Sequence, residues 1–388
     1  MAKETVLSDD LLQRCAARAA GYDRDNKFFT EDFEELKAAG YLSGPVPTEF
    51  GGGGLSLAES CAEQRRLAYH APATALAINM HIYWAGIAAD LWRSGDKSLE
   101  WLLEESATGE VFAAGHSERG NDLPVFLSTA TAKKVDGGYR FSGHKMFSSL
   151  SPVWTRFGFH AMDADAEGGP RIVHAFMPRN TAGYTIKETW DTLGMRATRS
   201  DDTLIEDAFV ADKYVARTVP AGQGDPFVLT LFAWALLGFA SVYCGIAQRA
   251  VDLAVPSTKK KTSLAVSRSM AYHPEVQHTV AQMVLANESI LPYLEKTCAD
   301  WTNGVDHGAV WPSKIVATKY HAVETCWKVV DLAMDVSGGS GMFRGMELER
   351  LFRDARCGRF HPATSNLTHE IVAKTALGID LGEQPRWG

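Results

Sequence analysis

The sequence predicts an α+β protein in which a central β region separates two helical regions. Apolar residues recur three and four positions apart from Asp9 to about Gly109 and again after Gly224. Between these regions, β-branched and aromatic residues alternate with polar ones. The chain has 388 residues, which exceeds the length at which a single core usually stops growing. We therefore expect three domains, at residues 1–112, 113–222 and 223–388.

The first region contains two recognisable helix starts. In FFTEDFEELKAAGYLSG, Thr30 stands before an apolar run with helical spacing, and the run ends before Gly44. A glycine loop follows, and Ser56 then stands before a second amphipathic run. We expect Thr30 and Ser56 to be N-caps.

The central region shows strand patterns around a turn. TATAKKVDGGYRFSGHKMFSS alternates on both sides of Asp136, Gly137 and Gly138, which is typical of a β-hairpin. GPRIVHAFMPRN and DTLIEDAFVADKYV also have the composition of strands. This part of the chain is therefore predicted to be a β domain.

The third region opens with an uncharged run from Phe227 to Ala247 that is long enough to span a membrane. The run contains Thr, Ser, Gly and Cys and has no basic residues at its start. A buried central helix is the favoured interpretation, and no membrane span is expected. Two long amphipathic runs follow, at residues 273–301 and 311–336.

Charge and cysteine content exclude several classes of function. The net charge of -8 is unsuited to a nucleic-acid surface, and the basic run Lys259–Lys261 is too short to change that. The six cysteines form no CxxC pair and have no histidine at metal-ligand spacing, so neither disulfides nor a metal site are indicated. The N-terminus carries acidic residues where a signal peptide would be apolar. We expect a cytoplasmic protein.

Four segments in order resemble the acyl-CoA dehydrogenase superfamily of flavoproteins: EFGGGGLSLAE, SGHKMFSS, WDTLGMRATRSDDTLIEDAFV and DVSGGSGMFRGMELERLFRDARCGRF. The resemblance implies an N-terminal helical domain, a barrel-like central β domain and a C-terminal four-helix bundle. It also implies FAD bound between the domains and against a neighbouring subunit. A homotetramer or homodimer is then expected, and a heteromer stays open.

The same resemblance assigns residues to the flavin. His116 and Ser117 fall in the first flavin loop, where Ser117 keeps a hydroxyl although Arg119 replaces a proline. Phe147 and Ser149 keep an aromatic face and a hydroxyl near the flavin N5. The other residues assigned to the flavin are Lys261, Leu264, Asp335, Gly338, Gly339, Thr364 and Asn366. For the two glycines, a turn between helices is the alternative interpretation.

The stretch RFHPATSN lies where most of the family carries the glutamate that removes a proton from an acyl thioester, and here that position is Pro362. A minority of relatives carry the base on the long helix that opens the last domain, and the matching residue is Ala235. His361 is the remaining candidate base, with a packing role as the alternative. Ser365 or Asn366 is expected to cap a helix that begins near residue 367.

Three functions follow from the resemblance. The first is α,β-dehydrogenation of an acyl thioester, bound to CoA or a carrier, with electrons passed through FAD to an acceptor flavoprotein. The second is a monooxygenase that uses O2 and reduced FAD or FMN on a small molecule and needs no carboxylate base. The third is a base-less subunit of a heteromeric acyl-CoA dehydrogenase. The commonest chemistry of the fold places the dehydrogenase slightly ahead of the monooxygenase.

Overall fold

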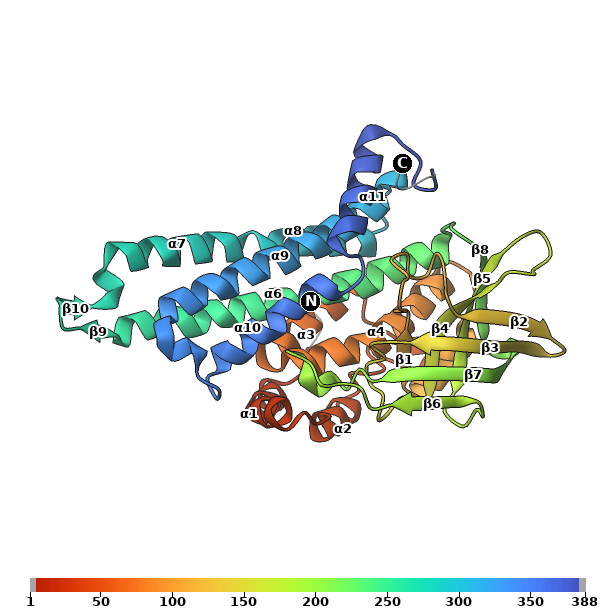
Figure 1. Ribbon diagram of the computed structural model, residues 1–388, viewed down its shortest axis with the longest axis horizontal. Coiled ribbons are helices and arrows are strands. Elements are labelled where there is room, and N and C mark those ends of the chain that lie inside the picture. The colour runs from red at the N-terminus through yellow and green to blue at the C-terminus, as the bar shows by residue number, and fades with distance from the viewer. Residues whose placement is uncertain (1–4, 384–388) are drawn as a thin grey trace.

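The computed structural model describes residues 5–383. Residues 1–4 and 384–388, at the ends of the first and last predicted domains, lie outside the described residues. Figure 1 shows long helices side by side in one half of the molecule and a twisted sheet in the other, with α1 and α2 next to both. The α+β class with helices on either side of a β region in the sequence is confirmed. The division into domains stays a prediction.

The described part of the N-terminal region folds into five α-helices, and one of them, α4 (Pro72–Arg93), is almost entirely buried. Ser56 caps its helix as predicted, because its Oγ accepts from the Glu59 amide and the Glu59 carboxylate accepts from the Ser56 amide. The prediction for Thr30 was wrong by one residue: Thr30 is the first helical residue and Phe29 is the N-cap. The helices are α1 (Asp9–Asp25), α2 (Thr30–Ala38), α3 (Leu57–His70), α4 (Pro72–Arg93) and α5 (Glu100–Ala107).

The central region forms one mixed sheet of eight strands in the order β6-β7-β3-β2-β4-β5-β8, with β1 paired in parallel to β4. The predicted hairpin joins β2 to β3, and Gly137 takes the left-handed φ of +74° that the turn requires. The strands are β1 (Phe112–Gly115), β2 (Thr131–Val135), β3 (Gly138–Lys145), β4 (Arg156–Asp163), β5 (Arg171–Pro178), β6 (Tyr184–Lys187), β7 (Asp202–Ala211) and β8 (Val215–Pro220).

The C-terminal region packs long helices around the predicted apolar one, α6. By length and composition α6 could cross a membrane, but 94% of its most apolar 18-residue window is buried inside the protein. The prediction of a buried central helix is therefore confirmed. The elements are α6 (Pro226–Lys260), β9 (Thr262–Ser263), β10 (Val266–Ser269), α7 (Pro274–Glu288), α8 (Ile290–Thr302), α9 (Trp311–Ser337), α10 (Glu347–Cys357) and α11 (Ser365–Leu377).

Helices α4 and α6 pack closely at two glycines, where a further side chain would have no room. A Cβ on Gly86 would lie 2.2 Å from the Trp234 ring, and one on Gly238 would lie 2.1 Å from the Asn79 side chain. The Trp234 indole donates to the Asp90 carboxylate at 2.7 Å and ties the two helices together. This contact fixes the distance between the two helical walls of the cavity described below.

The cap of the last helix lies one residue before the predicted caps. Thr364 is the N-cap of α11, and its Oγ1 accepts from the Leu367 amide at 3.4 Å. Ser365 and Asn366, which were predicted as caps, are the first two residues of the helix instead. A hydroxyl at position 364 is the better cap because its backbone is extended, with φ -64° and ψ 166°.

Candidate functional site

A cavity of about 450 Å³ opens where the two helical regions meet the sheet. Its walls come from α4, α6, the end of β1, the segments around residues 147–149 and 190–200, and the segment that links α10 to α11. No Asp, Glu, Lys or Arg is present among the described residues that line it. Most of the lining is aliphatic or aromatic, so the cavity suits an uncharged molecule or the ring of a cofactor.

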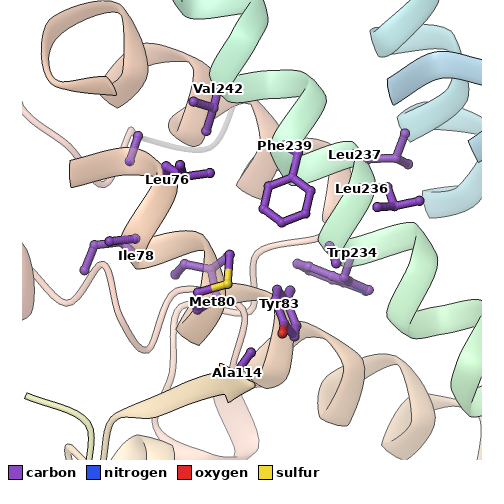
Figure 2. Packing of buried hydrophobic residues seen from close by; sticks show 14 of the residues in the cluster. Leu76, Ile78, Met80, Tyr83, Ala114, Trp234, Leu236, Leu237, Phe239 and Val242 are labelled. Carbon is purple, nitrogen blue, oxygen red and sulfur yellow. The ribbon is translucent and has the colours of Figure 1, made fainter. Parts of the chain in front are cut away.

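Two facing helices form the apolar side of the cavity. Leu76, Met80 and Tyr83 lie on one face of α4 at helical spacing, opposite Phe239 of α6 (Figure 2). Tyr83 is 2% exposed, and no hydrogen bond of its hydroxyl is found within the described part of the chain. Burial raises the pKa of Tyr83 well above its usual value, so the hydroxyl stays neutral. It is a free hydrogen-bonding group in the cavity wall.

A row of three buried hydroxyls forms the opposite, sheet-side wall. Ser149 Oγ lies 2.7 Å from Ser200 Oγ, which lies 2.7 Å from Thr198 Oγ1. Thr198 Oγ1 in turn contacts the Met195 carbonyl oxygen at 2.8 Å. All four residues line the cavity. The loop after β3 and the loop before β7 supply these hydroxyls, and the pairing of their strands holds the loops together.

An aromatic corner stands next to the hydroxyl row. Phe147 has a positive φ of 56° and is 50% exposed, and its ring meets the Trp190 ring edge-on at 5.9 Å. The Trp190 indole is held by the Met195 carbonyl oxygen at 3.2 Å. The nearby Ser148 hydroxyl is buried and has no partner within the described residues. An exposed ring beside hydroxyls fits a planar polar heterocycle such as the isoalloxazine of a flavin.

His361 lines the cavity in a fixed orientation. Its Nε2 is hydrogen-bonded to Tyr243 Oη at 2.8 Å, and its ring stacks on Phe239 with 4.9 Å between the ring centroids. Burial, together with the charge of Lys319, lowers the pKa of His361 to about 3. The imidazole is therefore neutral at physiological pH and is a weak proton acceptor.

Both positions at which the resemblance would place a catalytic base line the cavity, and neither has a carboxylate. Pro362 lies next to His361, and Ala235 lies on the α6 wall one turn before Phe239. No other acidic side chain lines the cavity within the described residues. Removal of a proton from a bound thioester would therefore have to rely on neutral groups.

Lys319 supports the segment that carries His361, and sequence reasoning missed it. This lysine of α9 is 3% exposed, and its Nζ donates to the carbonyl oxygens of Gly358, His361 and Ala363 at 3.3, 2.9 and 3.0 Å. Burial lowers the pKa of Lys319 to about 7. The sequence contained one signal for its burial: Lys319 lies four residues after Ile315, on the apolar face of the predicted helix.

His116 and Ser117 line the cavity near the end of β1. The His116 Nδ1 lies 3.1 Å from the Nδ1 of His160, and burial holds the pKa of both rings well below the usual value. Behind them, the buried Lys145 and Glu118 form an ion pair. His160 and Lys145 were not predicted, because each belongs to a strand whose pattern indicates only burial.

The structure brings five of the predicted site residues to one cavity: His116, Ser117, Phe147, Ser149 and His361. Five others lie away from this cavity, around the end of α6 and the turn after α9: Lys261, Leu264, Asp335, Gly338 and Gly339. There, Lys261 Nζ contacts the Ser337 carbonyl oxygen, and Leu264 is fully exposed. Figure 1 shows this end of α6, next to β9 and β10, at the opposite end of the molecule from the sheet.

Two predicted flavin ligands have other roles in this chain. Thr364 is the cap of α11, and Asn366 is exposed in its first turn. Neither lines the cavity. Their assignment to a flavin stays a prediction.

Comparison with protein families gives two matches that together span both helical regions. A model of the acyl-CoA dehydrogenase N-terminal domain matches residues 8–100. A model of the acyl-CoA dehydrogenase C-terminal domain matches residues 222–377. The two matches lie in the order that the sequence segments predicted.

Individual relatives include a putative acyl-CoA dehydrogenase and an amino sugar nitrososynthase. The putative acyl-CoA dehydrogenase YdbM of Bacillus subtilis is 26% identical over 360 residues, covering 92% of each chain. The amino sugar nitrososynthase RubN8 of Streptomyces rubradiris is 29% identical over 97% of this chain and 89% of its own length. Among solved structures, KijD3 in complex with FMN and dTDP-3-amino-2,3,6-trideoxy-4-keto-3-methyl-D-glucose has a TM-score of 0.85 and 25% identity, and covers 96% of this chain and 92% of its own.

Proposed function

The chain belongs to the acyl-CoA dehydrogenase superfamily and is a flavin-dependent oxidoreductase, and on this premise we propose that it is a monooxygenase that uses reduced flavin and O2. One observation carries the proposal: no Asp, Glu, Lys or Arg side chain lines the cavity among the described residues. A monooxygenase of this superfamily can work without a carboxylate base, whereas thioester dehydrogenation requires one.

The residues present argue against proton abstraction from a thioester. The two positions of the base are Pro362 and Ala235. His361 has a pKa of about 3, so in water near pH 7 it would take up a carbon-bound proton far less readily than a carboxylate in a dry pocket. Its Nε2 is also engaged by Tyr243. The base-less subunit of a heteromer would share these features, and the experiment below separates the two.

The flavin is proposed to lie against the aromatic corner and the hydroxyl row. Phe147 and Trp190 offer ring surfaces, and Ser149 offers a hydroxyl that can donate or accept. Relatives bind FMN or reduced FAD, and both share the same ring system. When bound, the reduced flavin supplies the two electrons that activate O2. The protein holds the ring and excludes water with the apolar residues of α4 and α6.

The substrate is proposed to be an uncharged amine-bearing sugar, because relatives act on amino sugars by name and this cavity offers no partner for a cation. A protonated amine would lose its hydration without compensation, so the neutral amine is the form that binds. In the overall reaction one oxygen atom of O2 forms the N–O bond of a hydroxylamine and the other becomes water. The reduced flavin supplies two electrons and two hydrogens and leaves as oxidised flavin.

Assembly is part of the proposal. The resemblance places Lys261 and Leu264 at a contact with the flavin of a neighbouring subunit, and their position away from the chain's own cavity agrees with that assignment. We therefore propose a homodimer or homotetramer. Light scattering with and without FAD would test this, and a monomer at micromolar concentration in both samples would contradict it.

The deciding experiment uses the purified chain with flavin in two arms, both prepared without O2. In one arm, acyl-CoA thioesters of several chain lengths are added while the oxidised flavin band is followed, and no bleaching is expected. In the other arm, flavin is reduced externally and mixed with O2, and the oxidised band is expected to return after a lag that free flavin lacks. With an amino sugar present, ¹⁸O from labelled O2 should appear in the product. Thioester bleaching would instead establish dehydrogenation, and neither response would favour a base-less subunit.

A further inference from the structure

The row formed by Ser149, Ser200 and Thr198 has a property that an isolated hydroxyl lacks. Each hydroxyl carries one hydrogen and can also accept. The three oxygens are linked at 2.7 Å, and the inner end of the row meets the Met195 carbonyl oxygen at 2.8 Å. No other side-chain hydrogen bond to Ser149 or Ser200 is found in the described residues. The direction of the row is therefore set by its two ends.

We propose that this row is a reversible hydrogen-bond chain that lets Ser149 donate to the oxidised flavin and accept from the reduced flavin at the same ring atom. The inference rests on the proposed binding of flavin in this cavity. A flavin N5 is an acceptor when oxidised and carries a hydrogen when reduced, so a fixed donor would suit only one of the two states. A row that can reverse suits both.

The two directions follow from counting hydrogens. In one, Thr198 donates to Ser200, Ser200 donates to Ser149, and the Ser149 hydrogen is free for an acceptor in the cavity. In the other, Ser149 accepts from the ligand and donates to Ser200, Ser200 donates to Thr198, and Thr198 donates to the Met195 carbonyl oxygen. Every hydroxyl hydrogen has an acceptor in both directions.

Reversing the row requires little free energy, because the Met195 carbonyl oxygen has donors other than the Thr198 hydroxyl. This oxygen also accepts from the Trp190 indole at 3.2 Å and from the Thr198 backbone amide at 3.1 Å. When the Thr198 hydroxyl turns toward Ser200, the carbonyl keeps two donors. No buried group is therefore left without a partner in either direction.

Removal of the middle hydroxyl should affect the two flavin states unequally. In Ser200→Ala, Ser149 can still donate to oxidised flavin, and only an acceptor site is lost. When Ser149 accepts from reduced flavin, its own hydrogen has no acceptor, and an unsatisfied buried donor is the more unfavourable defect. We expect the ratio of the dissociation constants for reduced and oxidised flavin to rise about tenfold, which equals a midpoint potential lower by about 30 mV for a two-electron couple.

The test is anaerobic titration of the full chain with FMN and FAD, oxidised and dithionite-reduced, without substrate or O2. Thr198→Val is a near-isosteric second variant with the same predicted sign, because Ser200 then lacks an acceptor in the reduced state. Ser148→Ala is the matched control, since it removes a neighbouring buried hydroxyl outside the row. An unchanged ratio of the two dissociation constants in Ser200→Ala would contradict the proposed hydrogen-bond chain. If Ser200→Ala does not fold, an unchanged ratio in Thr198→Val would contradict it.

The outcomes separate this inference from the proposed function. A protein that binds flavin in neither state contradicts both. An unchanged ratio contradicts only the reversible chain. Bleaching by thioesters contradicts only the monooxygenase, because the titration involves neither substrate nor O2.

Discussion

The hydroxyl oxygen of Tyr243 lies 2.8 Å from Nε2 of His361 and connects the central helix α6 to the segment that links α10 to α11. The two residues are 118 positions apart, and His361 is also stacked on Phe239 of the same helix. This arrangement fixes the imidazole with one nitrogen occupied. His361 is therefore a neutral residue of the cavity wall with a fixed orientation. The proposed monooxygenase reaction needs no base at this position.

We predict that Tyr243→Phe leaves His361 without its partner and lowers the free energy of unfolding by about 1–2 kcal/mol, because a buried ring nitrogen loses its hydrogen bond. Product formation should also fall, since the ring can then turn. Tyr184→Phe is the matched control. This variant also loses one partly buried hydrogen bond, from the Tyr184 hydroxyl to the Arg179 carbonyl oxygen, but Tyr184 does not line the cavity. Urea unfolding and turnover of both variants check this. Equal losses of turnover would contradict the specific role of Tyr243.

Lys319→Met should displace the segment between α10 and α11. The variant removes the donor that serves three carbonyl oxygens, and we expect a loss of about 2 kcal/mol in unfolding free energy near neutral pH. Lys328→Met changes an exposed lysine of the same helix and should have an effect within about 0.5 kcal/mol. Proteolysis of the segment, followed by mass spectrometry, should be faster only in Lys319→Met.

The buried lysine also predicts a dependence of stability on pH. Burial lowers the pKa of Lys319 to about 7 in the folded chain, whereas an unfolded lysine titrates near about 10.4. Between these values the unfolded state binds more protons, so the contribution of Lys319 to stability rises with pH, by at most about 1.4 kcal/mol per unit. The difference in unfolding free energy between the native chain and Lys319→Met should therefore grow from pH 7 to 9. A constant difference would contradict this.

Local sequence signals predicted the elements of this fold better than its site. The Ser56 capping box and the uncharged run of α6 depend on residues within a few positions of one another, and both were confirmed. The support of the site depends on distant contacts. Ser149 meets Ser200 across 51 positions, and Lys319 meets His361 across 42. No periodicity encodes such pairs, because each residue alone has the pattern of an ordinary buried position.

The cap of α11 and the position of the flavin residues illustrate two further limits. Thr364, Ser365 and Asn366 are all good cap residues, and only the extended backbone at Thr364 selects one of them. Lys261 and Ser149 were both assigned to a flavin, yet within one chain Ser149 lines the cavity and Lys261 lies away from it. A sequence gives no indication of whether two such residues meet within a subunit or across an interface.

Tyr83→Phe should separate stability from binding. No hydrogen bond of the Tyr83 hydroxyl is found within the described chain, so its removal should change the unfolding free energy by less than about 0.5 kcal/mol. An oxygen-bearing substrate in the cavity would lose one hydrogen bond, and we expect roughly tenfold weaker binding. Calorimetric titration and thermal unfolding test both halves. A variant that loses stability but binds substrate normally would show that the hydroxyl has a structural partner instead.

The absence of a base can be tested by supplying one. Ala235 lies on the cavity wall of α6 at the position where a minority of dehydrogenases carry their carboxylate, and it is 6% exposed. A buried glutamate there should have a raised pKa and so suit proton removal, at a stability cost of a few kcal/mol. We predict that Ala235→Glu with bound flavin is bleached anaerobically by an acyl-CoA thioester, whereas the native chain and the near-isosteric Ala235→Gln are not. Bleaching of Ala235→Gln as well would mean that the substitution acts by reshaping the cavity. If Ala235→Glu binds flavin and thioester without bleaching, the cavity lacks more than a base, because the thioester is then not held with its α-carbon within reach of residue 235.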